Sequence, residues 1–219
     1  MLTISYVILV HGENEVFELV QYIHINKNPD DKIIILNDPT TPEYEKKLKT
    51  LPVKVINHKL NKDYATHRNA AVEQVKTDYA FFIDADEFPH INLLKNLKAV
   101  LEANNKPDLI WLPRLNRFKG IRPIHALEQG WTLKGDVVNW PDPQTRIYKN
   151  RTGIKFVGVL HERLKTLPHH KIFHLPNSPE WSLLHRKTID RQIQDGLRYQ
   201  SSYTPAENSG EVTMKALKE

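Results

Sequence analysis

The chain has 219 residues, of which 40% are hydrophobic and 26% are charged, as is ordinary for a soluble globular domain. No apolar run approaches the roughly 20 residues that a membrane-spanning helix needs, and no basic segment precedes the first apolar run, so we expect neither a transmembrane helix nor a signal peptide. The complete lack of cysteine excludes disulfides and thiolate chemistry, and we expect a cytoplasmic protein.

The first half of the sequence alternates strand-like and helix-like segments. Short apolar runs predict strands, and apolar residues repeated every three or four positions predict helices. In chain order, the predicted strands are 4–10, 32–36, 53–56, 79–83 and 109–112, and the predicted helices are 13–23, 42–51, 64–76 and 91–102. Strands and helices that alternate through short connections indicate an α/β fold, with a mainly parallel sheet and helices on both faces.

The pattern is looser in the second half. Glycine and proline residues between 117 and 142 predict loops with short elements, and residues 144–148 and 155–160 predict two late strands. An apolar stripe of Ile189, Ile193 and Leu197 predicts a helix over 182–200. We therefore expect a single domain over residues 1–200, followed by a loose polar tail over 201–219.

Positive charge is concentrated toward the C-terminus. Residues 1–145 carry 18 Lys and Arg against 19 Asp and Glu, whereas residues 146–219 carry 13 against 7. A basic C-terminal third could contact phosphate, another anionic ligand or a membrane surface, or it could simply be a solvated basic face.

The strongest chemical signal is the acidic sequence Asp84-Ala85-Asp86-Glu87, which directly follows the most apolar predicted strand. Ligands of open α/β sheets bind at the carboxyl ends of the strands. Carboxylates held there need a positive partner, and a hard divalent cation such as Mg²⁺ or Mn²⁺ satisfies them while it also binds substrate phosphate. The alternative is an acidic loop that caps the following helix.

Six segments in this order and spacing resemble the family 2 glycosyltransferases of the GT-A fold, and the resemblance covers residues 3–200. The six segments are Ile4–His11, Asn37-Asp38, the helix start Ala65–Ala71, the D-x-D motif Asp84–Asp86, Gln144–Tyr148 and Phe156–Glu162. The chain departs from the family at Asn37-Asp38-Pro39-Thr40, where Asp-Asp-Gly-Ser is usual. It also lacks the common Glu-Asp pair that supplies a base, and His161-Glu162 stands at about that place.

The resemblance implies a GT-A (Rossmann-like) domain with a nucleotide-sugar-binding half at residues 1–115 and an acceptor-binding, catalytic half at residues 116–200. It implies transfer of a sugar from a nucleotide diphosphate, with a UDP-sugar as the favoured donor, to a hydroxyl group with inversion at the anomeric carbon. A glycan or glycolipid is the expected acceptor, and a modified nucleic acid is a less favoured one. Peripheral membrane contact through residues 182–200 stays open.

The same resemblance implies roles for particular side chains. Asp86, Asp84 and His161 are the expected ligands of Mn²⁺ or Mg²⁺. His11, Asp38, Arg68 and Asp84 are expected to bind the nucleotide sugar, because they lie where the family holds the base, ribose and diphosphate. Glu162 is the expected catalytic base, with Asp142 as its rival.

Other classes of protein share parts of this pattern. An Asp-x-Asp motif after an apolar strand also occurs in haloacid-dehalogenase-type phosphatases, where Asp84 would be the nucleophile and Asp86 the acid/base. That motif normally follows the first strand, whereas here three strand units precede it. A nucleotidyltransferase would need a basic, glycine-rich first turn. A catalytically inactive module that binds a nucleotide sugar or glycan remains the non-enzymatic alternative.

Overall fold

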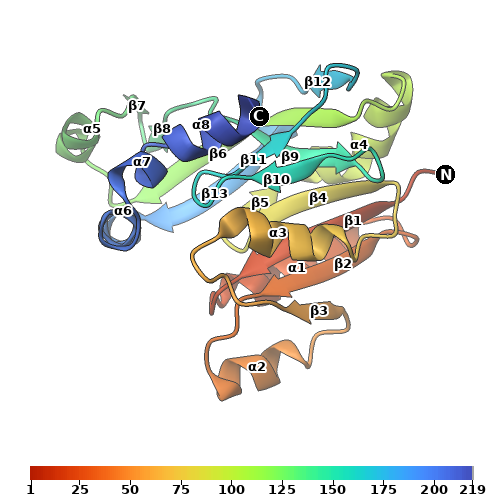
Figure 1. The fold of residues 1–219 in the computed structure, drawn as a ribbon, viewed down its shortest axis with the longest axis horizontal. Helices are drawn as coiled ribbons and strands as arrows, with labels where there is room; N and C mark the ends of the chain where they lie inside the picture. The colour runs from red at the N-terminus through yellow and green to blue at the C-terminus, as the bar shows by residue number, and fades with distance from the viewer. Residues whose placement is uncertain (219) are drawn as a thin grey trace.

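The computed structural model describes residues 1–218 as a large sheet with helices against both faces (Figure 1). The strands are β1 (Ile4–Val10), β2 (Lys32–Asn37), β3 (Lys54–Asn57), β4 (Tyr79–Asp84), β5 (Glu87–Pro89), β6 (Leu109–Lys119), β7 (Leu133–Lys134), β8 (Val137–Val138), β9 (Pro143–Lys149), β10 (Lys155–Val157), β11 (Arg163–Lys165), β12 (Ile172–His174) and β13 (Leu183–Thr188). The helices are α1 (Glu15–Asn26), α2 (Pro42–Leu48), α3 (Tyr64–Val72), α4 (Ile91–Ala103), α5 (Pro123–Gln129), α6 (Ile189–Ser202), α7 (Pro205–Asn208) and α8 (Glu211–Lys218), with a 3-10 turn η1 (Pro179–Trp181).

The sheet runs in the order β3-β2-β1-β4-β9-β6-β13-β5. Strands β3, β2, β1 and β4 are parallel, β9 is antiparallel to both β4 and β6, and β13 is again parallel to β6. Strands β1 to β4 thus build one side of the sheet and β9, β6, β13 and β5 build the other, while β10 and β11 form a separate hairpin. The prediction of a mainly parallel α/β sheet is confirmed.

Alternation along the central strands explains why both faces are covered. On β4, Tyr79, Phe81 and Ile83 enter one core with side chains of α1 and α4, whereas Ala80 and Phe82 enter a second core with α3 and the β10–β11 hairpin. Successive strand residues point to opposite faces, so an unbroken apolar strand needs cover on both. Helices lie on both faces as predicted, and the hairpin completes the cover on the α3 side.

The segment predicted as one helix over 182–200 is a strand followed by a helix. Leu183 and His185 are buried where β13 pairs with β6 on one side and β5 on the other. Helix α6 begins only after Thr188, whose side chain accepts a hydrogen bond from Arg191 N. An N-terminal cap of this kind satisfies a backbone donor that has no partner within the helix.

The C-terminal tail also differs from the prediction of a loose polar segment. Residues 205–218 carry α7 and α8, and Thr213 Oγ1 donates to the carbonyl of Leu160 at 2.7 Å. Helix α8 packs against the β10–β11 hairpin, and α7 packs against α8 and α6 (Figure 1). Of the two expected late strands, the one over 144–148 lies within β9 as predicted, whereas the one over 155–160 stops at Val157.

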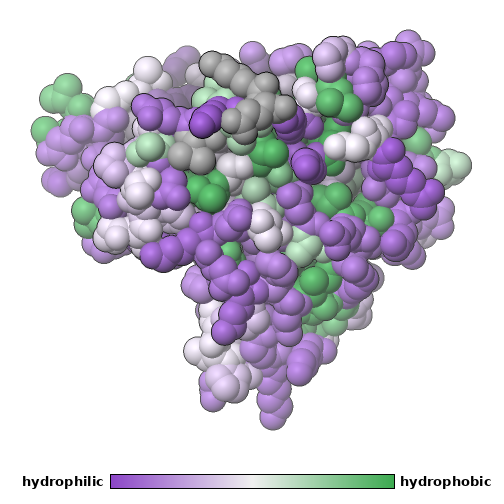
Figure 2. All heavy atoms as spheres, viewed as in Figure 1, coloured by the Kyte–Doolittle hydropathy of each residue, from purple (hydrophilic) through white to green (hydrophobic). Residues whose placement is uncertain are grey.

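The face of the molecule seen in Figure 2 is largely hydrophilic, with hydrophobic residues in small groups. At the left end of that view, around α5, the exposed apolar side chains include Ile124 and Leu127. Within residues 1–218, no helix combines the length and apolar character that a bilayer crossing requires.

Candidate active site

A cleft of about 1280 Å³ lies at the carboxyl ends of β1, β2 and β4. The ends of these strands contribute His11, Asp38, Asp84 and Asp86 to its lining, and α3, β13 and α6 contribute further polar side chains. All of the predicted site residues except Asp142 line this cleft. The parallel strands therefore bring together side chains that are far apart in the sequence.

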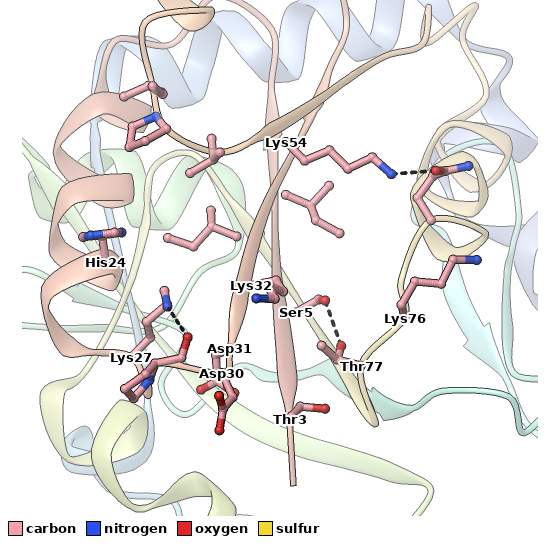
Figure 3. Close-up of a pocket in the computed structure, with 17 residues that line it drawn as sticks. Thr3, Ser5, His24, Lys27, Asp30, Asp31, Lys32, Lys54, Lys76 and Thr77 are labelled. Carbon is pink, nitrogen blue, oxygen red and sulfur yellow. Dashed lines mark hydrogen bonds between the residues drawn. The ribbon is translucent and has the colours of Figure 1, made fainter.

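A second hollow, of about 860 Å³, lies at the opposite ends of β1 and β2 (Figure 3). Ser5, Lys32 and Thr77 are among the residues that line it, and Ser5 and Thr77 are hydrogen-bonded to each other at 2.8 Å. Ligands of parallel sheets bind at the carboxyl ends of the strands, and this hollow lies at the amino ends. The larger cleft is therefore the candidate active site.

Asp84 is held between two arginines. Arg68 Nη2 donates to its Oδ1 at 3.0 Å, and Arg146 Nη2 donates to its Oδ2 at 2.7 Å. Burial by itself would favour the protonated acid, but the charges of Arg146 and Arg68 outweigh it and hold the pKa of Asp84 well below its usual range. Asp84 is therefore an ionised carboxylate whose two oxygens are already engaged by cations.

Glu87 is a buried carboxylate that shares Arg146 with Asp84. It is fully buried, and its Oε1 accepts from Arg146 Nη2 at 2.8 Å and from Arg114 Nη1 at 3.1 Å. The sequence alone leaves Arg146 in need of a partner, for which phosphate is one option; in the fold its partners are Asp84 and Glu87. Since buried charges are tolerated only when they are paired, these contacts fix the floor of the cleft.

Asp86 has a different set of neighbours. His185 Nε2 lies 3.5 Å from its Oδ2, and Arg191 Nη2 and Lys187 Nζ lie 3.6 Å and 4.0 Å from the same oxygen. Burial acts to raise the pKa of Asp86, but the hydrogen bond and charge of His185, together with Lys187, bring it below the usual value. Asp86 and His185, here called the Asp86–His185 pair, face each other inside the cleft.

The donor chemistry of this pair fits a divalent cation. A carboxylate oxygen and an imidazole nitrogen are both accepted ligands of Mn²⁺, and Mg²⁺ sites commonly use only one or two carboxylates plus substrate phosphate. Among residues 1–218, no group of three or more His, Asp or Glu side chains is arranged to hold a metal ion. The predicted trio of Asp84, Asp86 and His161 is thus not assembled, and any metal would need further ligands from a substrate.

His161 is instead tied to the C-terminal helices. It is exposed, and its Nε2 lies 2.8 Å from the carbonyl oxygen of Asn208 at the end of α7. Asp84 accepts from two arginines, so neither residue is placed as a direct metal ligand by its present contacts.

The two candidate catalytic bases, Asp142 and Glu162, differ in how many hydrogen bonds their carboxylate oxygens accept. Asp142 Oδ2 accepts from Arg114 Nε at 2.9 Å and Asn116 Nδ2 at 2.8 Å, and its Oδ1 accepts from Gln144 Nε2 at 2.9 Å. Glu162 lines the cleft, and its Oε1 accepts from Arg68 Nε. A base needs an oxygen free to take a proton, so the geometry favours Glu162 over Asp142.

The other end of the cleft is formed by the residues expected to contact the nucleotide. His11 Nδ1 lies 2.8 Å from Asp38 Oδ2, and Asp38 Oδ1 accepts from the backbone N–H of Leu60 at 3.2 Å. Behind them, His67 is buried with its Nδ1 at 3.3 Å from that of His58. Burial, and then the proximity of His58, lower the pKa of His67 to about 4, so this imidazole is neutral at pH 7.

The sequence analysis missed His185 as a site residue. The only local signal is the short apolar run Leu183-Leu184, which is compatible with a buried strand as well as with a buried helix segment. The expectation of a helix over 182–200 concealed it. Arg114 was missed for another reason: only the pairing of β6 with β9 and β13 brings it beside Glu87 and Asp142.

A mainly parallel α/β sheet with charged side chains converging at its carboxyl edge is an arrangement found in many nucleotide-binding enzymes. The chain belongs to the glycosyl transferase family 2, whose family model matches residues 7–164. The predictions of family and enzyme class are thereby confirmed, and the phosphatase and nucleotidyltransferase alternatives are not supported.

Solved structures with the same fold carry nucleotide sugars. The structure of S. aureus TarS 1–349 in complex with UDP-GlcNAc superposes with a TM-score of 0.63 at 15% identity, over 98% of this chain and 65% of that one. The mannosyltransferase PcManGT from Pyrobaculum calidifontis, in complex with GDP-Man and Mn²⁺, superposes with a TM-score of 0.57 at 12% identity, over 99% and 64% of the two chains. This chain therefore spans less than two thirds of these relatives, and such low identity establishes the shared GT-A fold only. A comparison with curated protein sequences finds no match.

Proposed function

We propose that this domain transfers a sugar from a nucleoside-diphosphate sugar, preferably a UDP-sugar, to a hydroxyl acceptor, with a divalent cation held by Asp86 and His185. The observation that carries the proposal is the Asp86–His185 pair in the same cleft as Asp38. Two protein ligands leave coordination positions for diphosphate oxygens, which is how Mg²⁺ and Mn²⁺ usually bind at such sites. When bound, the cation would neutralise charge on the leaving diphosphate as a Lewis acid.

The chain's own cations would assist at the same place. Lys187 and Arg191 lie beside Asp86, one from the end of β13 and the other from the first turn of α6, so both can approach a diphosphate bound there. Arg68 has a buried Nη1 without a hydrogen-bond partner in the described structure, although its Nε and Nη2 are engaged. A buried N–H group without an acceptor is costly unless a ligand satisfies it. This supports Arg68 as a residue that binds the nucleotide sugar.

Donor recognition would come from the strand ends on the other side of the cleft. We propose that Asp38 and His11 contact the nucleobase or ribose, and that Asp84, fixed by its arginines, orients the ribose side of the donor. Holding the donor by both ends places its anomeric carbon in a constant position, which is worth much of the rate enhancement in a bimolecular transfer.

Glu162 is the proposed base that takes the proton of the acceptor hydroxyl. A single displacement with one base and no covalent intermediate gives inversion, and the family resemblance favours this outcome. We propose a glycan or glycolipid as the acceptor in preference to a modified nucleic acid. Exposed Ile193 and Leu197 on α6 leave peripheral membrane contact available to a cytoplasmic enzyme of this kind.

The relatives support the donor class, because the TarS structure contains UDP-GlcNAc and the PcManGT structure contains GDP-Man with Mn²⁺. The two ligands differ in their nucleobase, so the direct test is to compare the binding of several nucleoside diphosphates. UDP, GDP, CDP and ADP are each added with and without Mn²⁺ while the melting temperature is followed. A ligand at a hundredfold excess over its dissociation constant stabilises the native state by about 2.7 kcal/mol, which is a few degrees for a chain of this size.

We expect a Mn²⁺-dependent rise with UDP that exceeds the rise with the other nucleotides. A larger rise in melting temperature with another nucleotide would contradict the assignment of a UDP-sugar. A rise that does not depend on Mn²⁺ would contradict the proposed role of a cation. If no nucleotide shifts the melting temperature, the alternative of a catalytically inactive module gains support and the proposed transfer is overturned.

A further inference from the structure

Asn116, on β6, lies between the Asp86–His185 pair and Asp142. It is 4% exposed, so its amide group needs partners within the protein. Its Nδ2 donates to Asp142 Oδ2 at 2.8 Å and to the carbonyl of Val138 at 3.3 Å, and its Oδ1 lies 2.8 Å from His185 Nδ1. Since both neighbours of Nδ2 are acceptors, a flipped amide would set oxygen against oxygen, and the orientation is determined.

This orientation decides which nitrogen of His185 carries the proton. Only a donor at Nδ1 can satisfy Asn116 Oδ1, so the neutral imidazole has its lone pair on Nε2. That nitrogen is the one 3.5 Å from Asp86 Oδ2. In this tautomer two electron-rich atoms face each other, so either a proton, which makes the His185–Asp86 hydrogen bond described above, or a metal cation must lie between them.

Asn116 is itself held by groups farther from the cleft. Asp142 accepts from it and from Arg114, whose Nε and Nη2 lie 2.9 Å and 2.8 Å from the same carboxylate oxygen. Arg114 in turn contacts the buried Glu87. A continuous chain of hydrogen bonds therefore runs from the ionic floor of the cleft through Asp142 and Asn116 to His185.

We propose that Asn116 is a positioning residue, which fixes the tautomer and ring orientation of His185 and thereby sets the cation affinity of the Asp86–His185 pair. The proposal rests on the proposed function, because that function assigns the pair to a cation. It also gives Asp142 a role in holding the Asn116 amide, in place of the role as rival base. Partners behind a metal-binding histidine typically change metal affinity 10- to 100-fold when they are removed.

The test uses the full chain and two readouts in the same samples. Imidazole ¹⁵N NMR of the metal-free protein reports which nitrogen of His185 is protonated, and titration with Mn²⁺ alone, followed by its EPR signal, reports cation affinity. The variant Asn116→Leu removes all three side-chain hydrogen bonds of Asn116. We expect a mixture of His185 tautomers and an affinity for Mn²⁺ about 10- to 100-fold weaker than that of the unmodified chain.

Asn37→Leu is the matched control. Asn37 is also buried, and it likewise bonds a carboxylate and an amide, Glu45 Oε2 at 2.7 Å and Asn57 Oδ1 at 2.9 Å. Its loss should lower the melting temperature without changing the His185 tautomer or the Mn²⁺ affinity. Equal effects of the two variants on Mn²⁺ affinity would overturn the proposal, because they would reflect a general loss of packing.

The variant Asn116→Ala guards against a variant that fails to fold, because it removes the same contacts without placing a larger apolar side chain between His185 and Asp142. We expect the same mixture of His185 tautomers and a similar loss of Mn²⁺ affinity. If either variant keeps the wild-type tautomer and Mn²⁺ affinity, the inference fails and the proposed function stands; if the unmodified chain binds no Mn²⁺ although its tautomer depends on Asn116, the proposed cation fails.

Discussion

Arg146 Nη2 lies 2.7 Å from Asp84 Oδ2, in an ion pair whose arginine side chain is 9% exposed. The same nitrogen contacts Glu87, so one guanidinium pairs with two carboxylates around the D-x-D turn. Both Asp84 and Glu87 raise the pKa of Arg146 above its already high ordinary value, against the opposing effect of burial, so it stays charged. Both oxygens of Asp84 are thus paired with arginines. Of the two aspartates in the D-x-D motif, Asp86 is therefore the better candidate to bind a cation.

Replacing Arg146 with Met should lower the free energy of unfolding by about 3–5 kcal/mol, because removing one partner of a buried ion pair leaves uncompensated charge. Denaturation by urea measures the change. Arg151→Met, at an exposed position, is the control and should cost little. Arg146→Lys should fall between them, since lysine keeps the charge but lacks the two-pronged geometry. A loss below about 1 kcal/mol for Arg146→Met would contradict the role given to this network.

Mn²⁺ affinity should depend on His185 and not on His161. We expect His185→Ala and Asp86→Asn each to weaken Mn²⁺ binding more than tenfold, since each removes one of two protein ligands. His161→Ala should leave the affinity unchanged, because His161 contacts Asn208 rather than Asp86. Calorimetric titration in the presence of UDP measures all three. Weaker binding in His161→Ala alone would restore the ligand set expected from the family resemblance.

Glu162→Gln should slow turnover far more than it weakens donor binding. Loss of a general base typically costs about 10²- to 10⁴-fold in rate. The amide can still accept from Arg68, so the donor site should keep its shape and UDP affinity should change little. Release of UDP from the UDP-sugar, with acceptor or with water, measures the rate. Asp142→Asn is the comparison, and a larger rate loss there would make Asp142 the base.

Stability should fall between pH 7 and pH 5 because of His67. Its pKa in the folded protein is about 4, below the 6.5 of an unperturbed histidine, so the unfolded chain takes up a proton first. The contribution is therefore present above about pH 6.5 and is lost as the pH falls toward 4. Between pH 7 and pH 5, we expect the free energy of unfolding to fall by about 1–2 kcal/mol.

Urea denaturation at a series of pH values checks this expectation. In His67→Gln the pH dependence should flatten, whereas His24→Gln, on the exposed side of α1, should keep it. Identical pH profiles for the unmodified chain and His67→Gln would show that another group is responsible.

Gly158 should be required for docking of α8. Its φ is +97°, and a Cβ there would lie 2.0 Å from Thr213 Oγ1, so Gly158→Ala combines backbone strain with a steric clash. We expect a cost of about 1–3 kcal/mol and faster hydrogen exchange in residues 211–218. Gly153→Ala is the control, because Gly153 has φ +80° but nothing within 4 Å of the added carbon. Unchanged exchange in α8 of Gly158→Ala would show that the contact does not hold the helix.

Local sequence patterns were sufficient for the fold and for the outline of the site. In β4, every position from Tyr79 to Ile83 is apolar, which favours burial on both faces, and Asp84 and the acidic turn after it mark the carboxyl edge. The order of six motifs identified the family, and the family model confirms it. Asp38, Arg68, Asp84, Asp86 and Glu162 do lie in one cleft.

The partners of those residues could not be predicted, because they come from strands that pair only in the folded chain. His185 reaches Asp86 since β13 lies between β6 and β5, and Arg146 reaches Asp84 since β9 inserts between β4 and β6. Sequence periodicity records which face of an element is apolar, but not which element it meets. Composition, strand order along the chain and the acidic motif were thus decided by the sequence alone. The pKa shifts of Asp84 and Asp86, and the position of His185 rather than His161 beside Asp86, were decided by tertiary packing, because they depend on burial and on neighbours distant in sequence.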